Sequence, residues 1–265
     1  MLAALLAAWA DPSRPQPSPL IELPLEQGRA ALCFPLDALT AILTEPPLPM
    51  QALASDSLES PAGLAQPVVS SILPSLVRQQ DNFLSPDEHQ ALLAYLLANE
   101  SRFVPATVDS AARDYRASLV LYDFPEYAAL FEARVRQQLP ELCRFFGIPL
   151  FDPSRVECQL NAHNDGHFYK THNDNGSPAT ARRLLTCVYY LHQQPCAFTG
   201  GALRLVDSRV ENNFYVAADT WRDIEPVDNS AVFFLSRCLH EIRPVQSANR
   251  SFAASRFAVT VWLSA

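Results

Sequence analysis

Apolar residues recur at helical spacing between residues 85 and 147. Ser85 followed by Pro86 predicts a helix start, because serine caps the first turn and proline fits the first helical position. One face of this helix would be buried through Leu92, Leu93, Leu96 and Leu97. Pro125 opens a second predicted helix, which Pro140 interrupts and whose pattern continues to Gly147. Its predicted core contacts are Ala129, Leu130, Ala133, Val135 and Leu139.

From residue 155 onward the sequence pattern is typical of short strands with turns between them. Val156, Cys158 and Leu160 alternate with polar residues, so one face is apolar and the other polar. Asn164-Asp165-Gly166 indicates a turn. Further strands are predicted over residues 168–172, 184–191, 202–206, 231–235 and 257–263. Helices followed by strands predict an α+β fold: a double-stranded β-helix (jelly-roll) barrel braced by the N-terminal helices.

A proline-rich region precedes these elements. More than half of the 22 prolines lie in the first 75 residues, and proline breaks helices and removes a backbone donor. We therefore divide the chain into an irregular N-terminal extension, residues 1–67, and a main domain, residues 68–265. The extension carries no motif with recognisable chemistry.

The charge, the hydropathy and the cysteine content indicate which binding partners and which cellular compartment to expect. The formal net charge is -8 at pH 7, which argues against a nucleic-acid partner held by its phosphates. No run of 18 or more apolar residues occurs, so no membrane span is expected. The six cysteines form no C-x-x-C pair, which predicts reduced thiols in a cytoplasmic protein. The apolar first ten residues lack the positive start of a secretory signal.

The first candidate for chemistry is His172-Asn173-Asp174. On an extended chain a histidine and a carboxylate two residues apart point the same way, so both can bind one metal ion. His240, at the end of an apolar strand, is the candidate third ligand. Two histidines and one carboxylate on one face of the metal are typical of non-haem Fe(II) oxygenases.

The second candidate is Arg256, which opens the strand Arg-Phe-Ala-Val-Thr-Val-Trp. An arginine inside a barrel is very costly without an anionic partner. That partner is either a protein carboxylate or a carboxylate co-substrate held by the two-pronged guanidinium.

Several segments together resemble the prolyl-4-hydroxylase-like family of 2-oxoglutarate- and Fe(II)-dependent dioxygenases. They occur in the family's order and with near-family spacing, and the resemblance runs from about Val77 to the C-terminus. The segments are residues 166–175, 183–191, 200–205, 240–245 and 256–262.

The resemblance implies a role for each matching residue. His172, Asp174 and His240 would bind Fe(II). Arg256 and Tyr190 would hold the distal carboxylate of 2-oxoglutarate, and Thr186 would line the same pocket. The implied reaction uses O2, releases succinate and CO2, and hydroxylates a C–H bond of a protein prolyl residue or a small molecule. Ascorbate is implied as a further cofactor.

Two positions depart from the family's pattern. The co-substrate cation usually follows the distal histidine by about ten residues, where this chain has Arg250, yet the strand pattern favours Arg256. Residues 247–255 would then be an insertion. In addition, His163 or a near neighbour stands where the family often has a tyrosine, on the strand before the metal pair.

Two other functions are compatible with the same residues. One is a non-catalytic jelly-roll binding module, which would be expected to have lost a ligand or the arginine. The other is a zinc hydrolase, which would leave Arg256 and Tyr190 without a role. The loops over residues 175–181 and 210–221 are expected to shape the substrate entrance.

Overall fold

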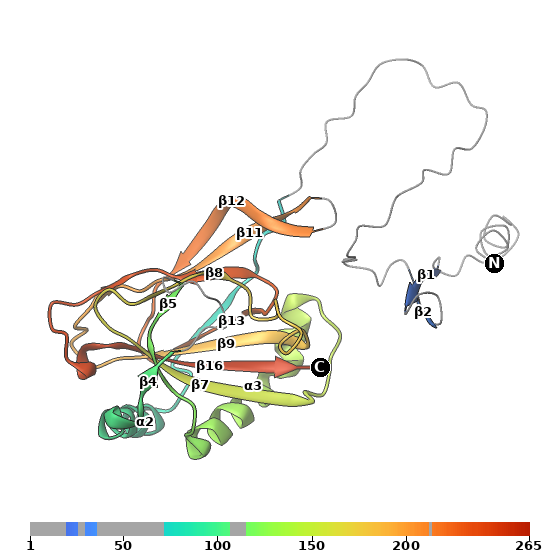
Figure 1. Cartoon of the computed structure of the whole chain (residues 1–265). Coiled ribbons are helices and arrows are strands. Elements are labelled where there is room, and N and C mark those ends of the chain that lie inside the picture. The colour runs from blue at the N-terminus through green and yellow to red at the C-terminus, as the bar shows by residue number, and fades with distance from the viewer. Residues whose placement is uncertain (1–19, 26–29, 36–71, 107–114, 212–213) are drawn as a thin grey trace, which may run out of the picture. The chain divides into compact units, whose positions relative to one another are not determined.

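A computed structural model describes residues 20–25, 30–35, 72–106, 115–211 and 214–265 (Figure 1). The chain divides into two compact units. The smaller contains the antiparallel pair β1 (Leu20–Leu25) and β2 (Ala30–Pro35). Most of the predicted extension over residues 1–67 lies outside the described residues, and its boundary stays a prediction. The elements described below lie in the larger unit, apart from residues 210–211 and 214–215, which are grouped with the smaller one.

Two helices form where the sequence predicts them. Helix α2 (Pro86–Ala98) begins with a capping box, in which Ser85 and Glu88 each accept the other's backbone N–H. Helix α3 (Pro125–Phe146) ends at Gly147, whose φ of 66° is left-handed. Neither described helix is long and apolar enough to cross a membrane.

The expected interruption of the second helix at Pro140 is wrong, because α3 continues through it. Leu139 and Leu142 on either side are buried in the core, and this packing outweighs the lost backbone hydrogen bond. Ala129 and Ala133 are exposed, so they are not the core contacts predicted for this helix. The buried face is instead made by Phe131, Val135, Leu139, Leu142, Cys143 and Phe146.

A seven-stranded sheet forms the centre of the unit. Its strands are antiparallel to their neighbours and lie in this order: β3 (Arg78–Asp81), β13 (Ser230–Leu235), β9 (Arg183–Leu191), β16 (Arg256–Ser264), β7 (Arg155–His163), β6 (Leu119–Leu121) and β4 (Val104–Pro105). The strands predicted near residues 156, 184, 231 and 257 are its four central members.

A second sheet has five strands in the order β12 (Phe214–Ile224), β11 (Leu203–Glu211), β14 (Leu239–Ile242), β8 (Phe168–His172) and β5 (Arg116–Ala117). A short pair joins β10 (Thr199–Gly200) to β15 (Val245–Gln246). The expectation of a loop over residues 210–221 is wrong, because most of that stretch lies in β12. Its alternating polar residues suit a strand with a solvent-facing side.

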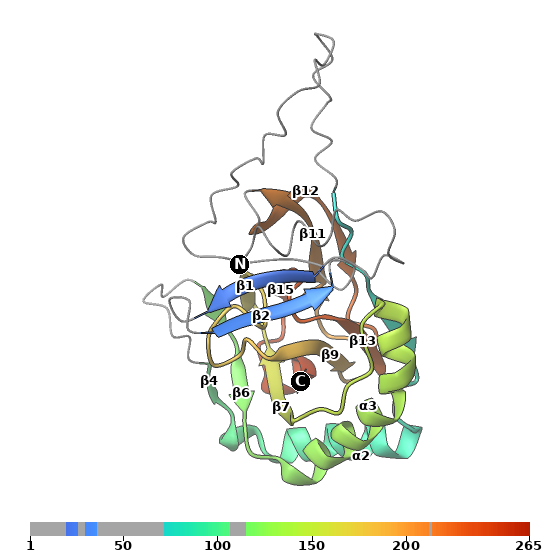
Figure 2. The same cartoon turned by 90° about the vertical axis from the view of Figure 1, so that its right-hand side faces the viewer.

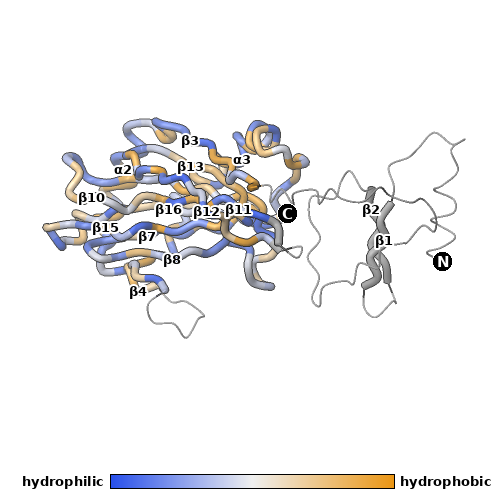
Figure 3. The backbone as a smooth tube through the Cα atoms, turned by 90° about the horizontal axis from the view of Figure 1, so that it is seen from above, coloured by the Kyte–Doolittle hydropathy of each residue, from blue (hydrophilic) through white to orange (hydrophobic). Residues whose placement is uncertain are grey.

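The two faces of the seven-stranded sheet have different partners. Tyr189 points to the helices, where its ring centroid lies 5.1 Å from that of Phe131. Thr186 and Val188, on the opposite face, line a cavity together with residues of the five-stranded sheet. The helices therefore brace one face, while the other faces the second sheet (Figures 1 and 2). Strands β9 and β13 are mostly apolar, whereas apolar and polar residues alternate along β7 (Figure 3).

Candidate active site

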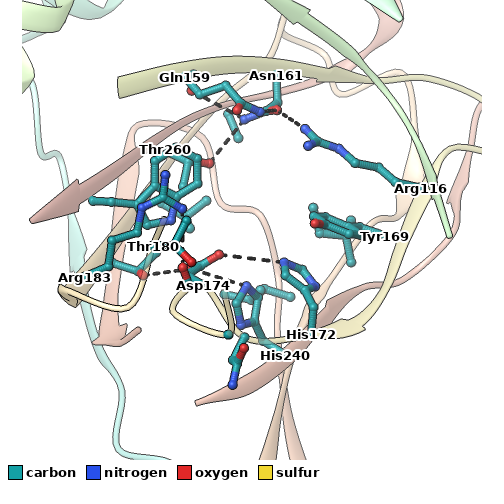
Figure 4. A pocket seen from close by; sticks show the side chains of 18 of the residues that line it. Arg116, Gln159, Asn161, Tyr169, His172, Asp174, Thr180, Arg183, His240 and Thr260 are labelled. Atoms are coloured by element: carbon teal, nitrogen blue, oxygen red, sulfur yellow. Dashed lines mark hydrogen bonds and ion pairs between the residues drawn. The ribbon is translucent and has the colours of Figure 1, made fainter. Parts of the chain in front are cut away.

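His172, Asp174 and His240 form a compact cluster at the second sheet. His172 and His240 are direct partners across the β8–β14 ladder, and their ring centroids lie 4.2 Å apart. Asp174 follows β8, and its carboxylate oxygens lie 3.8 Å from Nε2 of His172 and 3.6 Å from Nε2 of His240. The potential ligand atoms of all three lie within 4.8 Å of one another (Figure 4).

Backbone carbonyls orient both imidazoles. Nδ1 of His172 lies 2.8 Å from the Lys170 carbonyl, and Nδ1 of His240 lies 3.0 Å from the Cys238 carbonyl. A carbonyl only accepts, so each Nδ1 carries the proton and each Nε2 offers a lone pair toward Asp174. Burial, with His240 nearby, lowers the pKa of His172 to about 3. The ring is therefore neutral near pH 7 and suited to bind a cation.

Asp174 is held by its backbone and by Thr186. Its N–H donates to the Ser236 carbonyl at 2.9 Å. The Thr186 hydroxyl donates to Oδ2 of Asp174 at 2.8 Å and also lies 2.9 Å from the Ser236 hydroxyl. Such a hydrogen bond fixes the orientation of a carboxylate that binds a metal. Thr186, which the sequence placed in the co-substrate pocket, therefore contacts the aspartate of the cluster directly.

Arg256 enters the same cavity from β16. The residue is 1% exposed, yet none of its three guanidinium nitrogens has a hydrogen-bond partner among the described residues. Its guanidinium carbon lies 4.8 Å from the ring centroid of Tyr190, whose buried hydroxyl is also unpartnered. Burial lowers the pKa of Arg256 and raises the pKa of Tyr190 to about 12. The phenol thus keeps its proton and, like the guanidinium, can donate to an anion.

Further unpartnered groups lie beside Arg256. His163 is its direct partner across the β16–β7 ladder, and both ring nitrogens of His163 are buried without a hydrogen bond. Burial, reinforced by the charge of Arg256, lowers the pKa of His163 well below its usual value. Such orphaned polar atoms are rare in protein interiors. Their concentration here indicates a site built for a polar ligand.

The cavity has a volume of about 790 Å³ and is lined by both sheets. Five of the six residues singled out in the sequence line it: Thr186, His172, Asp174, His240 and Arg256. Tyr190 lies against Arg256. Gly176, Ser177 and Thr180 of the predicted entrance loop also line the cavity.

One wall carries a second arginine with a protein partner. Arg183 makes a two-pronged ion pair with Glu157, at 3.0 and 3.1 Å. Its guanidinium carbon lies 4.2 Å from the centroid of a Trp262 ring. This arginine is therefore already neutralised, unlike Arg256.

Arg250 and His89 lie away from the cavity. Arg250 is on the surface, with a side chain 81% exposed and paired with Asp165. His89, in α2, has a side chain that is only 12% exposed. It contacts the hydroxyl of Tyr189 and the carboxylate of Asp228, and so links α2 to the central sheet.

Sequence reasoning missed Arg116, which lines the cavity from β5. Strand β5 has two residues and no hydrophobic period that would predict it. The side chain reaches the site because β5 pairs with β8 in the second sheet, beside Tyr169. No local pattern in the sequence signals that pairing.

Two histidines and one aspartate lie in the cavity between the two sheets together with Arg256, and a set of two histidines and one carboxylate is typical of non-haem Fe(II) oxygenases. A family model described as the 2OG-Fe(II) oxygenase superfamily matches residues 158–264. An uncharacterized PKHD-type hydroxylase, sll0191 of Synechocystis sp. (strain ATCC 27184 / PCC 6803 / Kazusa), is 40% identical over 209 residues. The match covers 78% of this chain and 69% of that protein. The chain therefore belongs to the 2OG-Fe(II) oxygenase superfamily, and the predicted class of enzyme, a dioxygenase, is confirmed.

Solved structures agree with this assignment. A Pseudomonas putida prolyl-4-hydroxylase is 26% identical, with a TM-score of 0.52, over 72% of this chain and 92% of that one. A Trichoplax adhaerens prolyl hydroxylase, solved with a peptide of hypoxia inducible factor, is 21% identical with a TM-score of 0.52. That match covers 71% of this chain and 83% of the other, and supports the fold alone.

Proposed function

We propose that this protein couples the oxidation of 2-oxoglutarate to the hydroxylation of a substrate C–H bond. His172, Asp174 and His240 bind Fe(II), and Arg256 binds the distal carboxylate of 2-oxoglutarate. The observation that carries the proposal is the buried, unpartnered guanidinium of Arg256 in the cavity that also contains the three metal-ligand candidates.

The three ligand candidates fit a ferrous ion. Both imidazoles are fixed with Nε2 free, and Oδ1 of Asp174 remains available while Thr186 bonds Oδ2. Two nitrogen donors and one carboxylate leave coordination positions open for a chelating co-substrate and O2. Bound iron would supply the redox chemistry that activates O2 as 2-oxoglutarate is converted to succinate and CO2.

Arg256 and Tyr190 fit a dicarboxylate. A planar guanidinium binds a carboxylate through two parallel hydrogen bonds, and the Tyr190 hydroxyl adds a third donor. An anion at this position would compensate a charge that is otherwise costly to bury. The same burial excludes water, which strengthens each of these contacts. Thr186 contributes from the metal side by orienting Asp174.

The zinc-hydrolase alternative explains less of the site. A hydrolase that uses a zinc-bound water does not need to bind a dicarboxylate, so Arg256 and Tyr190 would have no role in the reaction. A binding module without catalysis would not need to retain all three metal ligands and the arginine, and this chain has all four.

We propose a protein prolyl residue or a small molecule as the hydroxylated substrate. The likeness to the P. putida prolyl-4-hydroxylase supports a prolyl group. We interpret the two facing sheets as the two halves of a jelly roll. A cytoplasmic location and the use of ascorbate stay predictions, the first resting on cysteines of which five are free in the described part of the chain.

The direct test is turnover without the hydroxylated substrate. Protein loaded with Fe(II) under argon and given 2-oxoglutarate should release succinate slowly once O2 is admitted, as measured by NMR. His172→Ala should release none, whereas Arg250→Ala, altered at the surface, should match the wild type. Absence of succinate from wild-type protein with verified bound iron would contradict the proposal.

A further inference from the structure

Arg116 is a cavity residue whose charge no carboxylate among the described residues neutralises. Its Nε donates to the Ser118 hydroxyl at 2.9 Å and its Nη2 to Oδ1 of Asn161 at 2.7 Å. Both acceptors are neutral. None of the carboxylates in the described part of the chain lies within ion-pair distance of Arg116. Burial lowers the pKa of its guanidinium, which reflects the cost of holding this cation away from water.

The other charges of the cavity balance without Arg116. Of the described residues that line it, three are arginines and Asp174 is the one carboxylate. Arg183 is paired with Glu157. A ferrous ion, Asp174, Arg256 and the 2-oxoglutarate dianion together have zero net charge. Arg116 therefore leaves one positive charge uncompensated in the loaded site, and this favours an anion as the remaining occupant.

Arg116 belongs to a polar wall across the cavity from the metal-ligand candidates. We define this wall as Arg116, Gln159, Asn161 and Thr260 (Figure 4). Asn161 accepts from Nε2 of Gln159 at 2.6 Å as well as from Arg116, and its own amide donates to Thr260 at 3.2 Å. These bonds fix the direction of the guanidinium, so that it is pre-organised for a ligand.

Tyr169 links the polar wall to the metal side. Its ring lies 4.9 Å from the guanidinium carbon of Arg116 and 3.6 Å, centroid to centroid, from His172. In Figure 4 Tyr169 lies between these two residues. A molecule that contacts both Arg116 and Tyr169 is thus brought beside His172, where the proposed function places the reaction.

We propose that Arg116 is a specificity-determining residue, which binds a carboxylate of the hydroxylated substrate against the polar wall. The inference rests on the proposed function, because the cavity must also hold the metal and 2-oxoglutarate. The carboxylate comes either from a free amino acid or from an acidic side chain next to the reacting residue of a peptide. In both cases the neutral analogue of the substrate binds poorly, since it leaves the partly buried cation of Arg116 unpaired.

The test compares acids with matched neutral amides on the full chain loaded with Mn(II) and saturating 2-oxoglutarate. One probe pair is N-acetylproline and its primary amide. The other is N-acetylprolylglutamate and N-acetylprolylglutamine, both with amidated C-termini. Ligand-observed saturation-transfer NMR gives each dissociation constant without turnover. The variants are Arg116→Gln, the charge-retaining Arg116→Lys, and Arg144→Gln on the exposed side of α3 as a matched control.

In wild-type protein the acid of at least one pair should bind about 10- to 100-fold more tightly than its amide. Arg116→Gln should abolish that preference, Arg116→Lys should retain part of it, and Arg144→Gln should leave it unchanged. The pair that shows the preference identifies the source of the carboxylate. No preference in either pair, or a preference that survives in Arg116→Gln, would overturn the inference.

The dissociation constant of 2-oxoglutarate, measured on the same samples, separates the two proposals. Arg116→Gln should leave it within about twofold of the wild type, because Arg256 is the anchor. A large loss would show that Arg116 binds the co-substrate instead, and would overturn the inference while leaving the proposed function intact. Failure of wild-type protein to bind 2-oxoglutarate at all would count against the proposed function itself.

Discussion

Gly201 lies against the side chain of Arg256. A β-carbon at Gly201 would lie 2.7 Å from Cδ and 3.2 Å from Nε of Arg256. The φ of Gly201 is +69°, a conformation that side chains of L-residues rarely adopt. The position therefore has to be glycine if the guanidinium is to stay where it is.

Gly201→Ala should accordingly displace the guanidinium and weaken 2-oxoglutarate binding by about tenfold or more, since two charged hydrogen bonds depend on its position. Gly147→Ala is the matched control: its φ is +66°, but no atom lies within 4 Å of the added carbon. That variant should lose about 1 kcal/mol of stability from the strained φ and bind 2-oxoglutarate normally. Isothermal titration of the two Mn(II)-loaded variants with 2-oxoglutarate measures their affinities, and urea unfolding measures the loss of stability. Equal affinities in the two variants would contradict this role of Gly201.

The two candidate anchors for the co-substrate can be ranked directly. Arg256→Gln should weaken 2-oxoglutarate binding by about 100-fold, because a bidentate charged contact is lost. Arg250→Gln should change it little, since that side chain is largely exposed and paired with Asp165. The reverse ranking in the same titration would show that Arg250 is the anchor.

Thr186 should act on the metal more than on the co-substrate. Thr186→Val removes the hydrogen bond to Oδ2 of Asp174 with little change in volume, and should weaken Mn(II) binding by about 10- to 100-fold. Thr260→Val, in the polar wall, is the control and should leave metal affinity unchanged. If Thr186→Val changes only 2-oxoglutarate affinity, the side chain contacts the co-substrate, as the sequence first suggested.

Asp228 should make the fold sensitive to acid. Burial raises its pKa, but hydrogen bonds from His89, from the backbone of His192 and from Gln194 outweigh this and hold the pKa at about 2. Because the folded pKa is below the unfolded value of about 3.9, Asp228 stabilises the fold above pH 4. That stabilisation is lost as the pH falls from about 4 to about 2.

Urea unfolding of wild-type protein and Asp228→Asn gives the size of this effect. At pH 7 the variant should be less stable by about 2 kcal/mol. The difference should shrink toward zero as the pH approaches 2. A difference independent of pH between 7 and 3 would show that the hydrogen bonds of Asp228 do not depend on its charge.

Local hydrophobic patterns, alternating along β7 and mostly apolar along β9 and β13, were enough to predict the central strands of the large sheet. Arg256, which opens β16, stood out because a charged side chain inside a barrel is costly without an anionic partner. His172 and Asp174 followed from the same geometry. These features are local, so a single sequence contains the information that predicts them.

The parts that sequence reasoning missed depend on contacts between distant segments. Strand β14 has four residues, and its pairing with β8 is what brings His240 opposite His172. Arg116 lies in a two-residue strand whose partner follows far along the chain. Helix α3 continues through Pro140 because tertiary packing outweighs the intrinsic preference of proline. Such effects arise from contacts between segments that are distant in the sequence, so local sequence patterns do not predict them.

The central claim is that one cavity holds the metal at His172, Asp174 and His240 and the co-substrate's distal carboxylate at Arg256. A crystal structure with Mn(II) and the unreactive analogue N-oxalylglycine, using anomalous diffraction to locate the metal, tests it most directly. The account predicts the anomalous peak between Nε2 of both histidines and Oδ1 of Asp174, with the analogue's distal carboxylate on the guanidinium of Arg256. A metal elsewhere, or that carboxylate bound at Arg116 or Arg250, would contradict it.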